Sequence, residues 1–156
     1  MMKITGLQLV EDALKQELSK LQGDQVALVG IHEAAGMHES GDLTVAAVGA
    51  YNHFGVPDKI PARPWLDVGV DTGTKEYLET IEEGIAEGLD SKQILEQVGA
   101  LAVGYTQQFI TDLRDPPNAD STIKKKGSDN PLIDTGNLRQ SVTYSVVRNV
   151  PSEGLE

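Results

Sequence analysis

The chain has 156 residues, of which 39% are hydrophobic and 24% charged, a composition typical of one globular domain rather than of a disordered segment. Lys and Arg number 13 against 24 Asp and Glu, and the formal net charge of -11 repels nucleic-acid phosphates and anionic membrane surfaces. Aromatic residues are only 4% of the chain, too few for a protein that stacks single-stranded bases, and the absence of cysteine excludes disulfides, zinc fingers and iron-sulfur clusters. We expect a single domain over residues 1–156.

No part of the sequence predicts a membrane helix or a secretory signal. The longest nearly uncharged segment, residues 43–57, is too short to span a bilayer and contains Asn52 and His53. Residues 1–5 lack the apolar region of a signal peptide. We therefore expect a soluble protein that acts inside the cell and has no membrane partner.

The N-terminal part predicts one helix and one strand. Residues 7–21 form an amphipathic helical pattern, and residues 25–31 form a short apolar run typical of a buried strand. The apolar positions of the helix recur at spacings of three and four: Leu7, Val10, Leu14, Leu18 and Leu21. We expect this helix to pack against the sheet to which the strand belongs.

The next two segments differ in how clearly they can be interpreted. Residues 43–54 fit a helical stripe through Thr44, Val48 and Tyr51, but their first half would also fit a strand. Residues 55–64 contain three prolines, each of which removes a backbone donor and favours an extended shape in its predecessor. We expect a rigid extended connector there.

Two helices are predicted in the second half of the chain. Residues 75–89 place Leu78, Ile81, Ile85 and Leu89 on one face, while five glutamates cover the others. Asp90 and Gln93 resemble a capping box, and a second apolar stripe then predicts a long helix over residues 91–113. The stripe consists of Ile94, Val98, Leu101, Tyr105 and Phe109.

The C-terminal part predicts a loop, a strand and a tail. Residues 115–130 hold almost no apolar side chain except Ile123, so we expect an extended basic surface loop. Residues 138–147 alternate polar and apolar side chains, as a half-buried antiparallel strand does. Residues 148–156 are expected to be a tail. The predicted fold is α+β, with a small antiparallel sheet packed against three to four helices.

Two Asp-Thr-Gly triplets, at residues 71–73 and 134–136, resemble the active-site triplet of aspartic proteases. Those enzymes need two carboxylates that share a proton within a symmetric, mostly β architecture. The helical pattern of this chain disfavours that architecture, and Asp and Gly are favoured turn residues. An aspartic-type hydrolase using Asp71 and Asp134 is therefore kept only as an alternative.

Other patterns of catalytic or metal-binding residues fail on their spacing. His32, Glu33 and His38 approach the zincin pattern, but position 36, where the second ligand would stand, is a glycine. His53 has no Ser or Asp partner at a triad-like spacing, so we interpret it as a packed or interface imidazole. No glycine-rich phosphate loop is present either. We predict no catalytic residue, no metal site and no cofactor.

The run Lys124, Lys125 and Lys126 is the only basic cluster in this acidic chain. It is either a solvated loop or an interaction element that docks on the acidic face of another copy or touches DNA that passes nearby. Contacts of either kind weaken with salt. Besides the hydrolase, a further alternative for the function of the chain is a small regulatory binding module that captures an acidic partner through these lysines.

Three short boxes of this sequence resemble those of a family of tailed-phage virion morphogenesis proteins, which includes tail-completion and head-tail joining proteins and the minor tail protein Z-like group. The likeness covers residues 26–147, with His53 where a Glu is commoner and Trp65 where Phe is usual. The boxes are AYNHFGVP (50–57), IPARPWL (60–66) and PLIDTGNLRQSV (131–142).

The resemblance implies a structural role in the phage neck or tail. The chain would form part of a homo-oligomeric ring at the head-tail interface, between the head connector or stopper and the tail terminator or tail tube, with transient contact to DNA in the lumen. It would lie in the virion, and in the host cytoplasm during assembly.

Within the boxes, we interpret one set of residues as an interface. Pro61 and Pro64 would hold the chain extended, Arg63 would present its donors, and Trp65 would be an apolar anchor. The alternative is that Trp65 is core and Arg63 caps a helix end. The predicted interface also includes Tyr51, His53 and Phe54 and the three lysines.

The third box is interpreted as a structural corner. Asp134, Thr135 and Gly136 would form the turn that precedes the last strand, with Asp134 accepting backbone donors. Arg139 belongs to the same structural turn.

Overall fold

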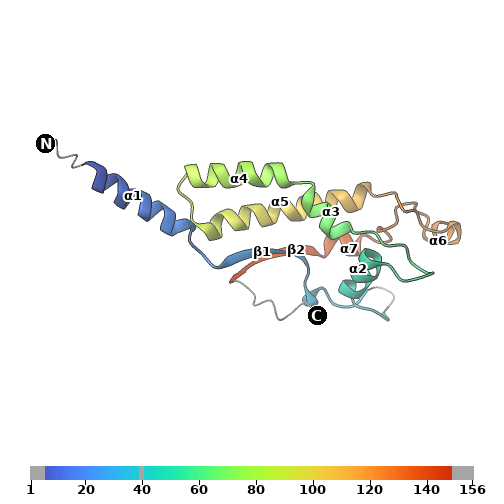
Figure 1. Cartoon of the computed structure of the whole chain (residues 1–156). Coiled ribbons are helices and arrows are strands. Elements are labelled where there is room, and N and C mark those ends of the chain that lie inside the picture. Colours follow the sequence, from blue (N-terminus) through green and yellow to red (C-terminus); the bar gives the residue numbers. More distant parts are fainter. Residues whose placement is uncertain (1–5, 39–40, 149–156) are drawn as a thin grey trace.

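A long central helix, α5 (Ser91–Asp112), lies along one face of a two-stranded antiparallel sheet in the computed structural model, which describes residues 6–38 and 41–148 (Figure 1). Strand β1 (Gln25–Ile31) pairs with β2 (Val142–Arg148), in a register that sets Leu28 opposite Ser145. The predicted α+β class and the antiparallel pairing are confirmed. β1 is half-buried rather than fully buried, because α5 covers one face of the sheet.

Helices α3 (Trp65–Asp71) and α4 (Thr74–Ala86) pack on α5, on the side away from the sheet (Figure 1). Helix α2 (Val45–Phe54) contacts β1 and α3, and the short helix α7 (Asn137–Gln140) joins α2 to α5 just before β2 begins. The main core lies where these elements meet. Its buried apolar side chains are Val45, Trp65, Ile110, Leu132, Leu138 and Val142.

Helix α5 begins as the sequence predicted. The Asp90 carboxylate accepts a hydrogen bond from the Gln93 backbone N–H at 2.9 Å, and the Gln93 side chain accepts one from the Asp90 N–H at 3.0 Å. The buried line of the helix differs from the predicted stripe, since Leu101 and Tyr105 are only half-buried. Three of its five buried positions are small or polar residues; the five are Ile94, Gly99, Ala102, Thr106 and Ile110.

The predicted apolar face of α4 is wrong in part. Leu78 and Ile85 are 57% and 45% exposed, because α4 meets α5 through glycine instead. A Cβ at Gly84 would lie 2.7 Å from an Ile94 side-chain carbon, so only glycine allows this approach. A hydrophobic pattern is based on large apolar side chains, so it does not indicate a helix contact that is made through glycine.

Helix α1 (Gly6–Leu21) confirms the predicted helix but not its packing. It extends beyond the end of α4 and α5, and it makes no extensive contact with another described element (Figure 1). Leu14 and Leu18 are 58% and 48% exposed. The middle of the apolar stripe of α1, at Leu14 and Leu18, is therefore largely open to solvent.

The ambiguous segment is helical. Thr44 caps α2 by accepting a hydrogen bond from the Ala47 N–H at 3.1 Å, and Gly55, at φ 77°, ends the helix. The connector after it is not uniformly extended. A bridge between Val56 and Ile60 closes a tight turn in which Asp58 has φ 58°, and the chain turns again at Pro64, where the Trp65 N–H donates to the Arg63 carbonyl oxygen at 2.6 Å.

The segment 115–130 is not simply a long loop. It contains α6 (Asp120–Lys126), whose first turn carries an acid and whose last turn carries the three lysines, the arrangement that stabilises a helix dipole. Gly127, in the left-handed conformation, ends this helix. The prediction failed because it weighed only apolar residues, whereas this helix depends on charge placement and its C-cap.

The last strand starts later than predicted. Gly136 adopts φ 86° and precedes α7, so residues 138–140 are helical and β2 begins at Val142. Arg148 ends β2 and does not belong to a tail. The rest of the predicted tail, 149–156, lies outside the described residues.

Candidate docking surface

Trp65 and Arg63 are core residues, which corrects their interpretation as docking residues. They are 3% and 2% exposed. The Trp65 ring lies in the main core, and its Nε1–H donates a 3.0 Å hydrogen bond to the carbonyl oxygen of Gly49 on α2. The tryptophan therefore ties α3 to α2, as the alternative interpretation held. Pro61 and Pro64, on either side of Arg63, are exposed.

The Arg63 guanidinium organises the segment that follows α5. Nε donates to the carbonyl oxygen of Pro116 at 2.8 Å, and Nη2 donates to that of Pro117 at 3.1 Å. The same group also reaches two asparagine side chains, Asn118 at 3.2 Å and Asn52 at 3.4 Å. All four acceptors are neutral, and burial lowers the pKa of the guanidinium. Arg63 holds residues 116–118 against α2 instead of capping a helix.

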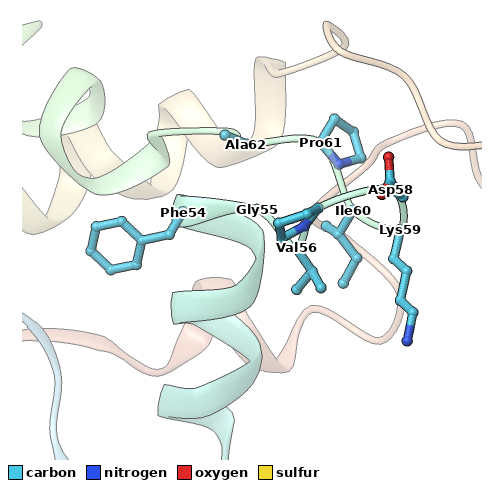
Figure 2. Close-up of a pocket in the computed structure, with 9 residues that line it drawn as sticks. Phe54, Gly55, Val56, Asp58, Lys59, Ile60, Pro61 and Ala62 are labelled. Carbon is cyan, nitrogen blue, oxygen red and sulfur yellow. The ribbon is translucent and has the colours of Figure 1, made fainter.

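Tyr51 and Phe54 provide the exposed part of the same motif. Both lie on α2, where Tyr51 is 45% exposed and Phe54 78% exposed. In Figure 2 the Phe54 ring points away from the turn that follows it. An aromatic side chain this exposed on an ordered helix is typical of an interface anchor.

Two depressions adjoin Phe54. One, about 570 Å³ in volume, lies along the turn of residues 54–62 (Figure 2). The other, about 230 Å³, lies between α2 and α3 and is mostly apolar. Its lining includes Ile31, Ala50, His53, Trp65 and Leu66. Phe54 belongs to both, so a partner that covers its ring would also reach a hollow on each side.

His53 is a packed imidazole that links α2 to α3. Its Nδ1 accepts a 3.5 Å hydrogen bond from the Leu66 N–H, and its Nε2 lies 3.3 Å from an Asp67 carboxylate oxygen. The ring packs edge-on against those of Phe54 and Trp65, at centroid distances of 4.6 Å and 6.1 Å. These contacts hold the C-terminal end of α2, which carries Phe54, against α3.

The three lysines divide into two groups. Lys124 and Lys125 are exposed at the end of α6, whereas Lys126 is half-buried and donates to the carbonyl oxygen of Asn130 at 3.1 Å. Burial lowers the pKa of Lys126, and nearby Arg63 lowers it further, while Asp134 opposes both effects. Only the first two lysines are placed to contact a partner.

Asn130, which the sequence analysis missed, holds the third box in place. Its side chain is buried, and its Nδ2 donates to the carbonyl oxygens of Ile110 and Thr111 at 3.0 Å and 2.9 Å. Its Oδ1 accepts from the N–H groups of Leu132 and Ile133 at 2.9 Å and 3.0 Å. The asparagine thus has the role we expected of Asp134. An Asn-Pro pair after a glycine was the available signal.

The turn that follows matches its structural interpretation in part. Gly136 supplies the positive φ, and Arg139 donates to Thr111 Oγ1 at 3.3 Å, which joins α7 to α5. Asp134 and Thr135 are exposed and line a small pocket of about 150 Å³ together with Lys126. The corner is therefore formed by Gly136, Arg139 and Asn130.

The two Asp-Thr-Gly triplets have different surroundings. Asp71 ends α3, where its charge adds to the burial that raises the pKa of Tyr77. Asp134 precedes α7 and acts on Lys126. Both aspartates are exposed. Nothing in this arrangement resembles two carboxylates that share a proton.

Among residues 6–38 and 41–148, no three His, Asp or Glu side chains gather as a metal site would require. In the same residues, no helix is long and apolar enough to cross a membrane. No family model, curated protein or solved structure matches the chain. The exposed ring of Phe54 and the two depressions beside it form the candidate docking surface of this chain.

Proposed function

We propose that this chain is a structural protein of a tailed-phage particle, a tail-completion or head-tail joining protein within the ring at the head-tail interface. The observation that carries the proposal is Phe54, which is 78% exposed within the box that resembles the phage family. Exposing a phenylalanine to water is unfavourable, and a docked partner removes that cost.

The surroundings of Phe54 favour docking over a mobile surface. Trp65 and His53 hold the helix from below, and the Arg63 hydrogen bonds fix residues 116–118 beside it. A rigid anchor loses little conformational entropy when it binds. A closed ring then repeats one modest heterologous contact, so each interface need not be large.

The charge of the chain agrees with a place around a DNA channel. A wall with a net charge of -11 per copy repels phosphates, so the genome would slide past it rather than adhere. Lys124 and Lys125, exposed on α6, would be the only local cluster able to attract DNA or an acidic subunit.

Native mass spectrometry tests the proposal. The purified chain is measured alone and with the neighbouring connector and tail-terminator proteins, across a salt series. We expect a closed oligomer, or a monomer that becomes multimeric on its partner. Phe54→Ser should weaken that assembly by about tenfold or more, because the burial of one phenylalanine contributes about 2 kcal/mol.

The matched control is Leu78→Ser, which removes an apolar side chain that is 57% exposed on α4, away from the motif. It should leave assembly unchanged. A chain that stays monomeric with every virion partner would overturn the proposal, as would equal effects of the two substitutions.

A further inference from the structure

Helix α5 has an exposed apolar groove that no described element of the chain covers. The groove has a volume of about 540 Å³ and lies on the surface of α5 alone. Its lining residues are Gln97, Ala100, Leu101, Gly104, Tyr105 and Gln108. A Cβ at Gly104 would meet nothing within 4 Å, so the groove is open at its centre.

The groove is electrically neutral, which is unusual in this chain. No charged residue occurs from position 97 to position 111, although 24% of the chain is charged. Glu76 on α4 lies near Tyr105, at the edge of the groove, and raises the pKa of its hydroxyl to about 12. A second depression shares Gln97 and Ala100 with the groove and continues it towards Leu89, and Glu96 is the one charged residue in its lining.

Helix α1 is the counterpart of this groove. Its 16 residues form an amphipathic helix whose Leu14 and Leu18 are exposed, and it extends away from its own α5 (Figure 1). The link that follows α1 lies close to the start of α5, since a Cβ at Gly23 would lie 3.0 Å from Ser91 Oγ.

We propose that α1 of one copy lies in the α5 groove of a second copy. The inference rests on the proposed assembly function and names the contact that joins adjacent copies. Electrostatics favours a second copy, because two chains of net charge -11 approach best through surfaces without like charges. The leucine stripe of α1 and the neutral face of α5 are such surfaces, whereas the surface of α4, which carries four glutamates, is not.

The area agrees with a contact of this kind. A 16-residue helix is about 24 Å long, and covering half of its circumference buries roughly 500 Å² of helix surface. With a similar area of the groove, the interface reaches about 1,000 Å², the lower limit for a specific complex. In a ring each copy donates one helix and receives one, which makes two such contacts per subunit.

Cross-linking tests the inference directly, because the chain contains no cysteine. Leu14→Cys and Ala100→Cys variants, one carrying a size tag, are mixed and treated with a short bis-maleimide. We expect a covalent dimer that contains one copy of each. Leu14→Cys mixed with Leu78→Cys, on the exposed side of α4, is the control and should give none.

Two results would overturn the inference. One is the absence of a mixed dimer. The other is an intrachain product from the Leu14→Cys/Ala100→Cys double variant, diluted until copies no longer meet, since α1 would then fold back on its own groove. In native mass spectrometry, we expect the Leu14→Ser/Leu18→Ser variant to form an oligomer about tenfold or more weaker than that of the wild-type chain.

The outcomes separate this inference from the proposed function. An oligomer or partner complex that forms without α1 contact would overturn the inference and leave the assembly function standing. A chain that exchanges α1 but binds no connector or tail protein would support the inference and overturn the neck role.

Discussion

Two neighbouring boxes of the sequence, residues 50–57 and 60–66, contain aromatic and basic side chains with opposite roles. Arg63 and Trp65 are buried at 2% and 3% exposure, whereas Tyr51 and Phe54 are 45% and 78% exposed. Arg, Trp and Tyr are common in binding hot spots, and Phe is enriched in the cores of interfaces. The comparison shows that residue type alone does not identify an anchor, because the same tryptophan or arginine also serves as core when its polar atoms find internal partners.

The largest expected effect tests the core side of this comparison. Trp65→Ala removes a large buried ring and its hydrogen bond to Gly49, so the free energy of unfolding should fall by about 4 kcal/mol. Urea unfolding followed by circular dichroism measures the change. Trp65→Phe should recover most of the stability, since phenylalanine fills most of the volume. A stable, assembly-defective Trp65→Ala would instead restore its role as an anchor.

Arg63→Ala should cost about 3 kcal/mol of unfolding free energy, because the carbonyl oxygens of Pro116 and Pro117 and the Asn118 side chain lose their donor. Arg63→Lys keeps the charge but cannot supply the planar set of donors, and we expect it to recover less than half of the loss. The same denaturant series measures both. Equal stability of the alanine variant and the wild type would contradict a structural role.

Gly49→Ala tests how closely α2 packs on the core below Phe54. Its Cβ would lie 2.9 Å from Ile31 Cδ1 and 3.1 Å from Leu138 Cδ1, so we expect a loss of about 2 kcal/mol in thermal or urea unfolding. The control is Gly104→Ala on α5, where the Cβ meets nothing within 4 Å. That change should stabilise the isolated chain by up to about 1 kcal/mol, and the opposite order of stabilities would contradict the packing described above.

Phe54→Ser should change the stability of the isolated chain by less than about 0.5 kcal/mol, since the ring is already in water. Phe54→Ser should therefore weaken assembly and leave stability nearly unchanged, whereas Trp65→Ala should lower stability. A fall of several kcal/mol in the free energy of unfolding, measured by differential scanning calorimetry, would show that Phe54 is a core residue.

The smallest effect concerns Tyr105, at the edge of the α5 groove. The hydrogen bond to Glu76, followed by burial, raises the pKa of Tyr105 from 10.0 to about 12. Because the folded state holds this proton more tightly, the associated stability is complete below pH 10 and is lost as the pH rises towards 12. Ultraviolet difference titration against Tyr105→Phe isolates the signal. Glu76→Ala should bring the pKa back towards 10, and an unchanged titration would contradict the hydrogen bond.

Prediction from the sequence succeeded where the pattern is local. The capping box of Asp90 and Gln93 and the strand 25–31 depend on residues a few positions apart, and both are confirmed. The α6 helix was missed because its three lysines were interpreted by charge and not by their place in the last turn. The exposed stripe of α4 was misassigned because Gly84, without a side chain, makes the contact.

The candidate site could be predicted only in part. The boxes drew attention to residues 50–66, but exposure separated their members, and exposure depends on which elements meet. Asn130 satisfies four backbone groups from two segments, Ile110 and Thr111 on one side and Leu132 and Ile133 on the other. The Asn-Pro pair indicates the local turn, but its hydrogen bonds to Ile110 and Thr111 span 20 and 19 positions and could not be predicted from it.

The sequence alone determined the α+β class, the long capped helix and the pairing-competent strands of this protein, because hydrophobic periodicity and end-capping are set by neighbouring residues. Only the tertiary structure decided that Trp65 is core, that Phe54 is surface and that Leu14 and Leu18 of α1 are exposed. The physical reason is that burial is shared between elements distant in the chain. A side chain becomes core or anchor according to what packs on it, which its own sequence neighbourhood does not specify.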